Sequence, residues 1–206
     1  MKHTLHCFLL ITFLALIGCM NSEPTVSFGK AMELAIEHNN YDELDAYINS
    51  ELFDVNADLN KAPMKSGELR RLRLNSGVSL FHAAAMKNNI PFAKHLIELG
   101  ANINVMSVGG TPLIVAVKKG HYDFVAFLLE AGVDTELSVP LRNETISEIV
   151  EETSGDIGDW GKSALELALE QNDFKVVSQL SKKIDFNTYR GLFGRTALHI
   201  TSRFAT

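Results

Sequence analysis

The stretch that decides the fold runs from Gly109 to Gly132 and reads GGTPLIVAVKKGHYDFVAFLLEAG. Thr111 is a residue type that caps the N-terminus of a helix, and Pro112 at the first helical position loses no hydrogen bond. Gly120 and Gly132 can each take the left-handed backbone conformation that ends a helix. The stretch therefore predicts two short helices joined by a tight turn at Gly120 and closed at Gly132.

The same pattern returns along the chain with a period of about 33 residues. Ser79, Ser163 and Thr196 match Thr111, at spacings of 32, 52 and 33 residues, and Lys30 is the weakest match, 49 residues before Ser79. Five residues after each of these positions lies a small residue: Ala35, Ala84, Ala116, Ala168 and Thr201. Nine residues after the first four lies a type that tolerates a left-handed turn: Asn39, Asn88, Gly120 and Asn172. The two long spacings, of 49 and 52 residues, each contain an inserted segment.

These copies resemble the ankyrin repeat, whose pattern Thr-Pro-Leu-His-x-Ala appears as TPLIVA at 111–116. The other copies read SLFHAA at 79–84, SALELA at 163–168 and TALHIT at 196–201. The resemblance covers about residues 28–206. It implies an all-α ankyrin-repeat solenoid of stacked helix-turn-helix units, about four and a half repeats with two long inter-repeat insertions, in which the last unit has only its first helix. It also implies that His82 and His199, at the family's histidine position, bond to neighbouring turns.

The N-terminus has the features of an export signal rather than of the fold. Cys7–Ile17 is an eleven-residue apolar run broken only by Thr12, about half of the roughly 20 residues that a membrane-spanning helix needs. The sequence LIGC at 16–19 then resembles a bacterial lipobox, in which Cys19 is lipidated. An ordinary secretory signal or an uncleaved anchor stays an alternative.

This resemblance divides the chain into a lipoprotein signal peptide at 1–18, a lipidated cysteine and tether at 19–27 and an ankyrin-repeat domain at 28–206. Met20 after the cysteine, rather than Asp, suggests the outer membrane by the usual Gram-negative sorting rule. Cys7 and Cys19 are the only cysteines, so the folded part contains no disulfide and depends on packing.

Few residues suggest catalysis or metal binding. Asp156 and Asp159 lack the spacing of a calcium loop, and no phosphate-binding, zinc or Ser–His–Asp pattern occurs. His121, between two predicted helices, is interpreted as a solvated polar residue. The net charge of −6 argues against a nucleic-acid partner. We therefore predict that the protein is not an enzyme and that it binds neither metal nor cofactor.

The two insertions carry opposite charge. The first, around residues 57–76, has a net charge of +3 and contains Arg70, Arg71 and Arg73 in a segment that is either a short helix or a strand. The second, around residues 136–159, has a net charge of −6; its residues Thr145–Glu148 form a capping box and predict a short amphipathic helix. Trp160, the only tryptophan, follows it directly.

Two interpretations of the insertions stay open. In the first, they are solvated loops whose opposite charges partly neutralise each other. In the second, they form a docking surface for a protein, because repeat families place insertions on the binding face and tryptophan is enriched at binding hot spots. The contacts would then be Arg70, Arg71, Arg73, Glu148, Glu151, Glu152 and Trp160.

Together these features predict a monomer, lipid-anchored at Cys19 and facing the periplasm, that binds another protein. Small ankyrin lipoproteins of this type resemble immunity proteins that neutralise membrane-attacking toxins delivered between bacteria. Another protein-binding alternative is a periplasmic scaffold that retains or stabilises an envelope enzyme. A hydrolase is the third class, and it would need polar groups that converge in a cleft.

Overall fold

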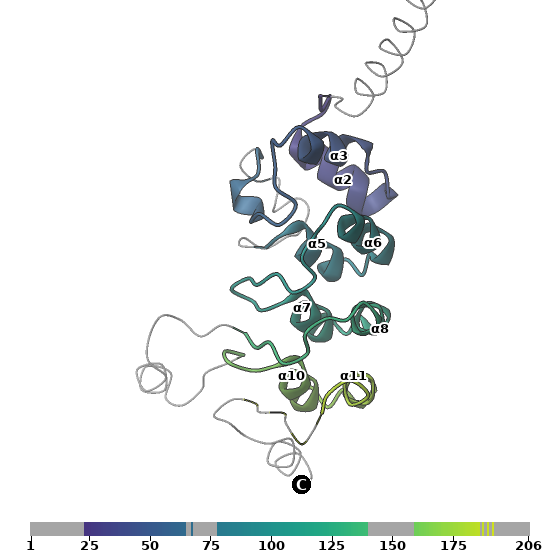
Figure 1. Ribbon diagram of the computed structural model, residues 1–206, viewed down its shortest axis with the longest axis vertical. Helices are drawn as coiled ribbons and strands as arrows, with labels where there is room; N and C mark the ends of the chain where they lie inside the picture. The colour runs from purple at the N-terminus through teal and green to yellow at the C-terminus, as the bar shows by residue number, and fades with distance from the viewer. Residues whose placement is uncertain are drawn as a thin grey trace, which may run out of the picture.

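The computed structural model of the protein describes residues 23–64, 67, 78–139, 159–185, 187, 189 and 191. They form four helix pairs: α2 (Phe28–His38) with α3 (Asp42–Asn49), α5 (Leu80–Met86) with α6 (Ile90–Glu98), α7 (Pro112–Lys119) with α8 (Tyr122–Glu130), and α10 (Ala164–Glu170) with α11 (Phe174–Leu180). A short 3₁₀ turn, η1 (Leu59–Lys61), lies between the first two pairs. Figure 1 shows the pairs stacked into one elongated array, which confirms the predicted all-α solenoid.

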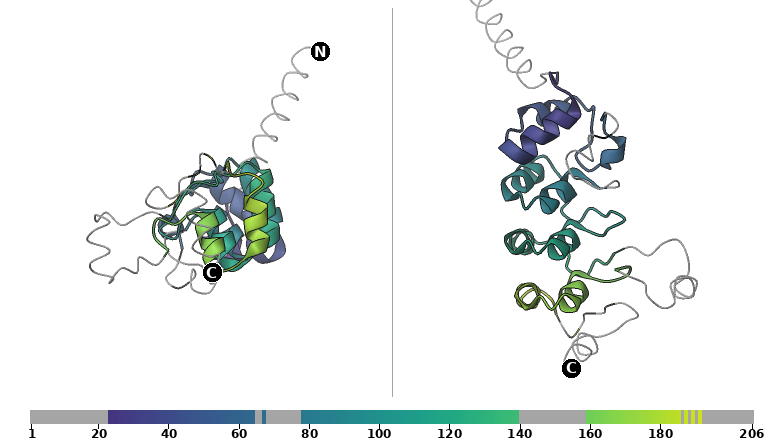
Figure 2. Two further views of the ribbon diagram at one scale, coloured as in Figure 1. Left: turned by 90° about the horizontal axis from the view of Figure 1, so that it is seen from below. Right: turned by 180° about the vertical axis from the view of Figure 1, so that it is seen from behind.

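The first helices of the units form one column and the second helices another. We call α2, α5, α7 and α10 the inner helices, and α3, α6, α8 and α11 the outer helices. Inner helices contact each other from unit to unit, as α5 does α7 and α7 does α10. The loops that lead from each outer helix to the next inner helix project from the inner column, away from the outer one (Figure 2). We call this side of the molecule the finger edge.

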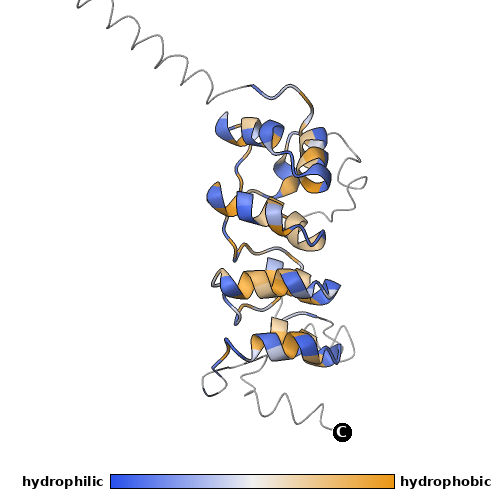
Figure 3. Cartoon of the chain, turned by 90° about the vertical axis from the view of Figure 1, so that its right-hand side faces the viewer, coloured by the Kyte–Doolittle hydropathy of each residue, from blue (hydrophilic) through white to orange (hydrophobic). Residues whose placement is uncertain are grey.

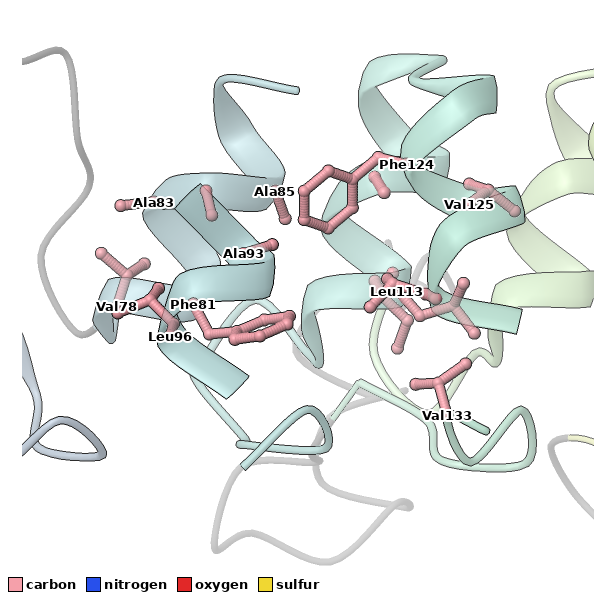
Figure 4. Packing of buried hydrophobic residues seen from close by; sticks show 14 of the residues in the cluster. Val78, Phe81, Ala83, Ala85, Ala93, Leu96, Leu113, Phe124, Val125 and Val133 are labelled. Carbon is pink, nitrogen blue, oxygen red and sulfur yellow. The ribbon is translucent and has the colours of Figure 1, made fainter. Parts of the chain in front are cut away.

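Stacking is what stabilises such short helices. Helices of 7 to 11 residues are marginal in water on their own, so each pair needs the apolar surface of its neighbours. One hydrophobic core accordingly runs from Phe28 in the first unit to Tyr189 beyond the fourth. The rings of Phe81 and Phe124, from consecutive units, lie 6.4 Å apart in an edge-to-face arrangement (Figure 4). The visible faces of the outer helices mix polar and apolar residues (Figure 3).

The predicted turn and packing positions are confirmed. Asn39, Asn88, Gly120 and Asn172 all have left-handed backbone angles, with φ between 52° and 67°. The four alanines of the small-residue position, Ala35, Ala84, Ala116 and Ala168, are completely buried. Thr111 and Ser163 accept hydrogen bonds from the backbone N–H groups of residues 114 and 166 and so cap their helices.

The first unit begins differently from the others, and one interpretation from the sequence, that of His121, was wrong. The first helix is capped by Ser27, whose hydroxyl accepts from the N–H of Lys30, so Lys30 lies inside the first turn and not at the cap. Lysine carries no acceptor with which to cap a helix. His121 is not a solvated residue: its Nδ1 lies 2.9 Å from the carbonyl oxygen of Ala85, and only a protonated nitrogen can donate to that carbonyl. His121 therefore links the third unit to the second.

His82 makes the bonds that the resemblance implies. Its Nε2 lies 3.0 Å from the carbonyl oxygen of Gly110 in the next unit, which requires Nε2 to carry the proton. Nδ1 is then the acceptor of the Ser79 backbone N–H at 3.2 Å. The ring is fully buried, and burial lowers its pKa below the ordinary value of histidine.

Replacing Glu51 by glycine is expected to stabilise the protein. Glu51 has φ of 59° just after α3, where the later units have Gly100 and Gly132, and its side chain is exposed. A left-handed non-glycine residue costs about 1–2 kcal/mol, whereas the freedom that glycine adds to the unfolded chain offsets roughly 0.5–1 kcal/mol. Glu51→Gly should therefore raise the melting temperature by about 2 °C. Glu51→Ala is the control; a Glu51→Gly protein that melts no higher than Glu51→Ala would contradict this.

The buried His82 should make the protein less stable as the pH falls. Its folded pKa is lowered, so below about pH 6.5, the ordinary histidine value, the unfolded state binds a proton that the folded state does not. The stabilisation is complete above that pH and is lost as the pH falls toward the folded pKa. The loss is at most about 1.4 kcal/mol per pH unit. Urea titrations at pH 7.5 and 5.5 should show a smaller pH difference for His82→Gln than for the wild type. Equal differences would show that His82 does not titrate as argued.

Candidate protein-binding surface

The loops of the finger edge are called fingers below. The finger between α6 and α7 presents two apolar side chains to solvent. Val108 at its tip is 78% exposed, and Met106 beside it is 43% exposed. Most other large apolar residues described in the structure are buried or partly buried in the core. Covering exposed apolar side chains with a partner is favourable because it removes apolar surface from water. This tip is therefore the first candidate contact.

Hydrogen bonds hold this tip in one conformation. The backbones of Ser107 and Gly110 exchange two bonds of 3.0 Å, and the Ser107 hydroxyl adds a third at 2.9 Å to the Gly110 carbonyl. His82 donates to the same carbonyl from the preceding inner helix. Gly110 has φ of 102°, and a Cβ there would lie 2.8 Å from the Ile114 side chain, so only glycine fits. Val108 is thus displayed on a rigid turn.

The bases of consecutive fingers are joined by asparagine side chains. Asn56 accepts from the N–H of Asn102 at 2.7 Å and donates to the Gly100 carbonyl at 3.3 Å. One unit later, Asn104 accepts from the N–H of Asp134 at 2.9 Å. These bonds fix the spacing between fingers, so a partner that spans two of them meets a preset surface.

The second insertion leaves the fold at the finger edge. The Val139 N–H donates to the Lys162 carbonyl at 2.9 Å, and the Gly161 N–H donates to the Val139 carbonyl at 2.8 Å. These bonds form a stem at the base of the insertion. Lys118 of α7 and Asp159 of the stem add an ion pair of 2.9 Å. The described ends of the insertion are therefore held beside the inner helix α7.

The first insertion has its own anchor. Leu59 of η1 is almost completely buried, and its N–H donates to the carbonyl of Val78 at 2.8 Å, one residue before the cap of α5. Asp58 accepts from the N–H of Asn60 and caps this 3₁₀ turn. The described segments before and after this insertion are thus bonded to each other at the second unit.

The fourth unit replaces the motif histidine with another buried arrangement. Glu166 stands where His82 stands in the second unit, and its carboxylate accepts from the Ser163 N–H at 2.9 Å. The Ser163 hydroxyl bonds to the hydroxyl of Tyr189, which comes from the following loop. Tyr189 is fully buried, and burial raises its pKa to about 12. The cluster consists of a helix cap and a loop anchor, so it is structural.

Of the contacts predicted from the sequence, the structure describes only Trp160. Trp160 is partly buried and packs against the hydrophobic core, which leaves only part of its ring for a partner. The others lie outside the described residues, so their docking role stays a prediction: Arg70, Arg71, Arg73, Glu148, Glu151 and Glu152. The lipidation candidate Cys19, His199 and Asp156 also lie outside them.

Sequence reasoning missed Met106 and Val108. The signal was present, because MSVGG at 106–110 places two apolar residues in a segment whose glycines indicate a turn. Apolar residues in a predicted turn have no core to enter and are candidates for exposure. Among the described residues, the other large apolar side chains that are exposed are Leu52, Ile97 and Phe174.

Within the part of the chain that the structure describes, no helix combines the length and the hydropathy needed to cross a bilayer. In the same residues, no group of three or more His, Cys, Asp or Glu side chains is placed to hold a metal ion.

Comparison with known proteins points to the repeats. A family model described as ankyrin repeats, in three copies, matches residues 32–138, which is just over half of the 206 residues. The chain is 32% identical over 90 residues to the potassium channel AKT1 of Arabidopsis thaliana, covering 40% of this chain and 10% of the channel. It is 36% identical over 62 residues to the E3 ubiquitin-protein ligase KEG of the same plant, covering 30% of this chain and 4% of the ligase.

The chain thus spans only a small part of either relative, so the similarity concerns the repeats and not the activity of those proteins. Ankyrin repeats form protein–protein interaction modules, which agrees with a rigid finger edge that presents apolar side chains. The stacked helix pairs, the left-handed turns and the matched residues lead to one assignment: the chain belongs to the ankyrin repeat family.

Proposed function

We propose that the protein binds another protein through its finger edge, with Val108 and Met106 as apolar contacts. The observation that carries the proposal is their exposure on a turn held by the Ser107, Gly110 and His82 bonds. Because the turn is rigid, little conformational freedom is lost when a partner covers it. Full burial of such a side chain is worth about 1.5–3 kcal/mol, and a partner gains the share that corresponds to the exposed part, which is larger for Val108 than for Met106.

The insertions extend this surface. Both begin and end at loops that precede an inner helix, and the stem of the second insertion lies beside the fingers. The basic first insertion and the acidic second insertion would steer a partner whose surface carries both signs of charge. In this proposal Arg70, Arg71 and Arg73 contact acidic groups, Glu148, Glu151 and Glu152 contact basic groups, and the exposed part of Trp160 adds an apolar contact.

We further propose that the binding domain is tethered to a bacterial membrane through a lipid on Cys19, facing the periplasm. The support is the short apolar run followed by LIGC at 16–19. A tether keeps the domain near the membrane, so a target that acts there is met at a raised effective concentration. In its specific form the protein is an immunity protein that neutralises a toxin in the envelope. In its alternative form it is a scaffold that retains or stabilises an envelope enzyme.

Val108→Asp is expected to weaken partner binding while the protein stays folded. The change places a charge where the partner needs an apolar contact, and the exposed position leaves the core intact. Calorimetry with the co-purified partner should show at least tenfold weaker binding, with a melting temperature within about 1 °C of the wild type. Ile97→Asp, at an exposed apolar site on the outer helix α6, is the control and should bind normally. If Val108→Asp binds as tightly as Ile97→Asp, the finger tip is not the contact.

Cys19→Ser is expected to release the protein from the membrane. A serine at this position cannot be lipidated, so the exported protein should move from the membrane fraction to the soluble fraction. Membrane fractionation with and without detergent, followed by mass determination of the N-terminal peptide, measures this. Firm membrane association of Cys19→Ser would rule out the lipid anchor and leave the protein-binding proposal standing.

The identity of the bound protein separates the two forms of the proposal. A toxin that is encoded beside this gene and is inhibited on binding would support the immunity form. A housekeeping envelope protein that loses abundance when this protein is deleted would support the scaffold form.

A further inference from the structure

A second surface lies on the outer helices, opposite the finger edge. Each outer helix carries an apolar side chain two residues after the left-handed turn residue. These equivalent residues are Tyr41, Ile90, Tyr122 and Phe174. In the first three units this side chain is partly buried, whereas Phe174 in the fourth is 71% exposed.

The junction between the first two units shows how such a position is covered. The imidazole of His95 on α6 stacks on the Tyr41 ring, with centroids 4.2 Å apart and an angle of 13°. His95 Nε2 also lies 2.7 Å from a carboxylate oxygen of Asp45, one turn after Tyr41. The following outer helix therefore contributes a flat polar side chain that covers the ring and bonds to its neighbour.

The junction between the third and fourth units repeats this contact with other residues. The ammonium group of Lys175 on α11 lies 4.1 Å from the centroid of the Tyr122 ring. Gln179, at the position equivalent to His95, donates to the Tyr122 carbonyl at 3.3 Å. Between the second and third units, Ile90 and Phe127 both pack against the core from these same positions. The surface is thus a recurring helix-binding face.

On α11 the same face is open. Phe174, Ser178 and Lys182 follow one another at intervals of four residues, so they share one side of the helix and its last turn, and all three are exposed. α11 is the last outer helix among the described residues (Figure 1). We call these three residues the α11 stripe.

We propose that the α11 stripe binds an amphipathic helix of a partner protein, which continues the outer column by one helix. The contact is continuous with the α3–α6 and α8–α11 interfaces, so the partner helix places a flat or cationic side chain over Phe174, as His95 and Lys175 do over their tyrosines. Opposite Lys182 it presents an acidic side chain, which pairs with the exposed ammonium group. This site depends on the proposed function only in that the partner is a protein.

A second copy of the chain fits this face poorly. Stacking copies end to end would need the first unit to offer an open outer helix, but residues 25–27 cover it. The Thr25 N–H donates to Glu43 at 2.8 Å, and the Tyr47 hydroxyl donates to the Val26 carbonyl at 2.7 Å. Ala46, at the position equivalent to His95, is already 95% buried, since it is 5% exposed. Pairing two α11 stripes in parallel would bring Lys182 against Lys182, which is repulsive; an antiparallel pair of copies is tested by the sedimentation experiment below.

The probe for the test is a helical peptide with the sequence of residues 89–99. That segment contains α6, which covers Tyr41 in the protein itself, so it carries His95 at the required position. Lys94 and Glu98 are exposed and four residues apart, so a lactam between their side chains holds the helix without touching the binding face. A glutamate replaces Leu99, because that position falls opposite Lys182 by analogy with the Asp45–His95 pair.

Binding is measured by fluorescence anisotropy of the labelled peptide against the full chain in mild non-ionic detergent. We expect saturable binding that Phe174→Ala weakens about tenfold, through loss of the buried ring. Lys182→Glu should weaken binding of this peptide and strengthen binding of a peptide with lysine at the same position. Val108→Asp, on the finger edge, should leave peptide binding unchanged.

Three results would overturn the proposal. These are no saturable binding to the wild-type chain, equal binding to Phe174→Ala, and a Lys182→Glu effect that does not reverse with the lysine peptide. Sedimentation that shows a wild-type dimer dissociated by Phe174→Ala would assign the face to a second copy instead. The finger-edge proposal fails separately, if Val108→Asp binds the natural partner normally.

Discussion

The structure depends on the close approach of consecutive inner helices. Ala35, Ala84, Ala116 and Ala168 occupy the same position in four units and are completely buried, as expected where closely packed helices leave room for a small side chain only. This packing compensates for helices that are too short to persist alone, and it makes every unit the support of the next. A fold built in this way has two free edges along its length, one at the fingers and one at the outer helices.

The finger edge is ordered by bonds that cross unit boundaries. His82 reaches the Gly110 carbonyl, and Asn56 and Asn104 each bond the base of the following finger. In the fourth unit a Ser163–Tyr189 hydrogen bond anchors the following loop, and Glu166 takes the place of histidine. A fully buried polar group must be bonded, so the exchange of histidine for glutamate is accompanied by a hydroxyl from the next loop. The result is a row of bonded loop bases, and the turn with Met106 and Val108 presents two apolar side chains to solvent.

Contacts between units also order the outer helices, but the side chains that make these contacts differ from one junction to the next. Its junctions use a stacked imidazole in one place and a lysine over a tyrosine ring in another, so the contact tolerates different partners. That tolerance supports the proposal that the α11 stripe binds a helix of a partner protein. The protein then has two separable surfaces: a rigid finger edge, and a helix edge that extends by addition. Charged insertions at the finger edge would set the choice of partner there.

The sequence by itself determined the repeat, its register and its turns, because each rests on local chemistry. A cap hydroxyl at Thr111, a left-handed Gly120 and a small Ala116 can be recognised in one unit and counted along the chain. It failed where a residue acts through another unit: His121 reads as a solvated residue until Ala85 of the preceding unit lies beside it. The weak match at Lys30 also has a structural reason, because α2 begins one turn earlier than the other inner helices do and is capped by Ser27. Only the tertiary structure decided which apolar residues stay exposed: Tyr122 and Phe174 occupy equivalent positions, but among the described residues only Tyr122 has a further outer helix against it.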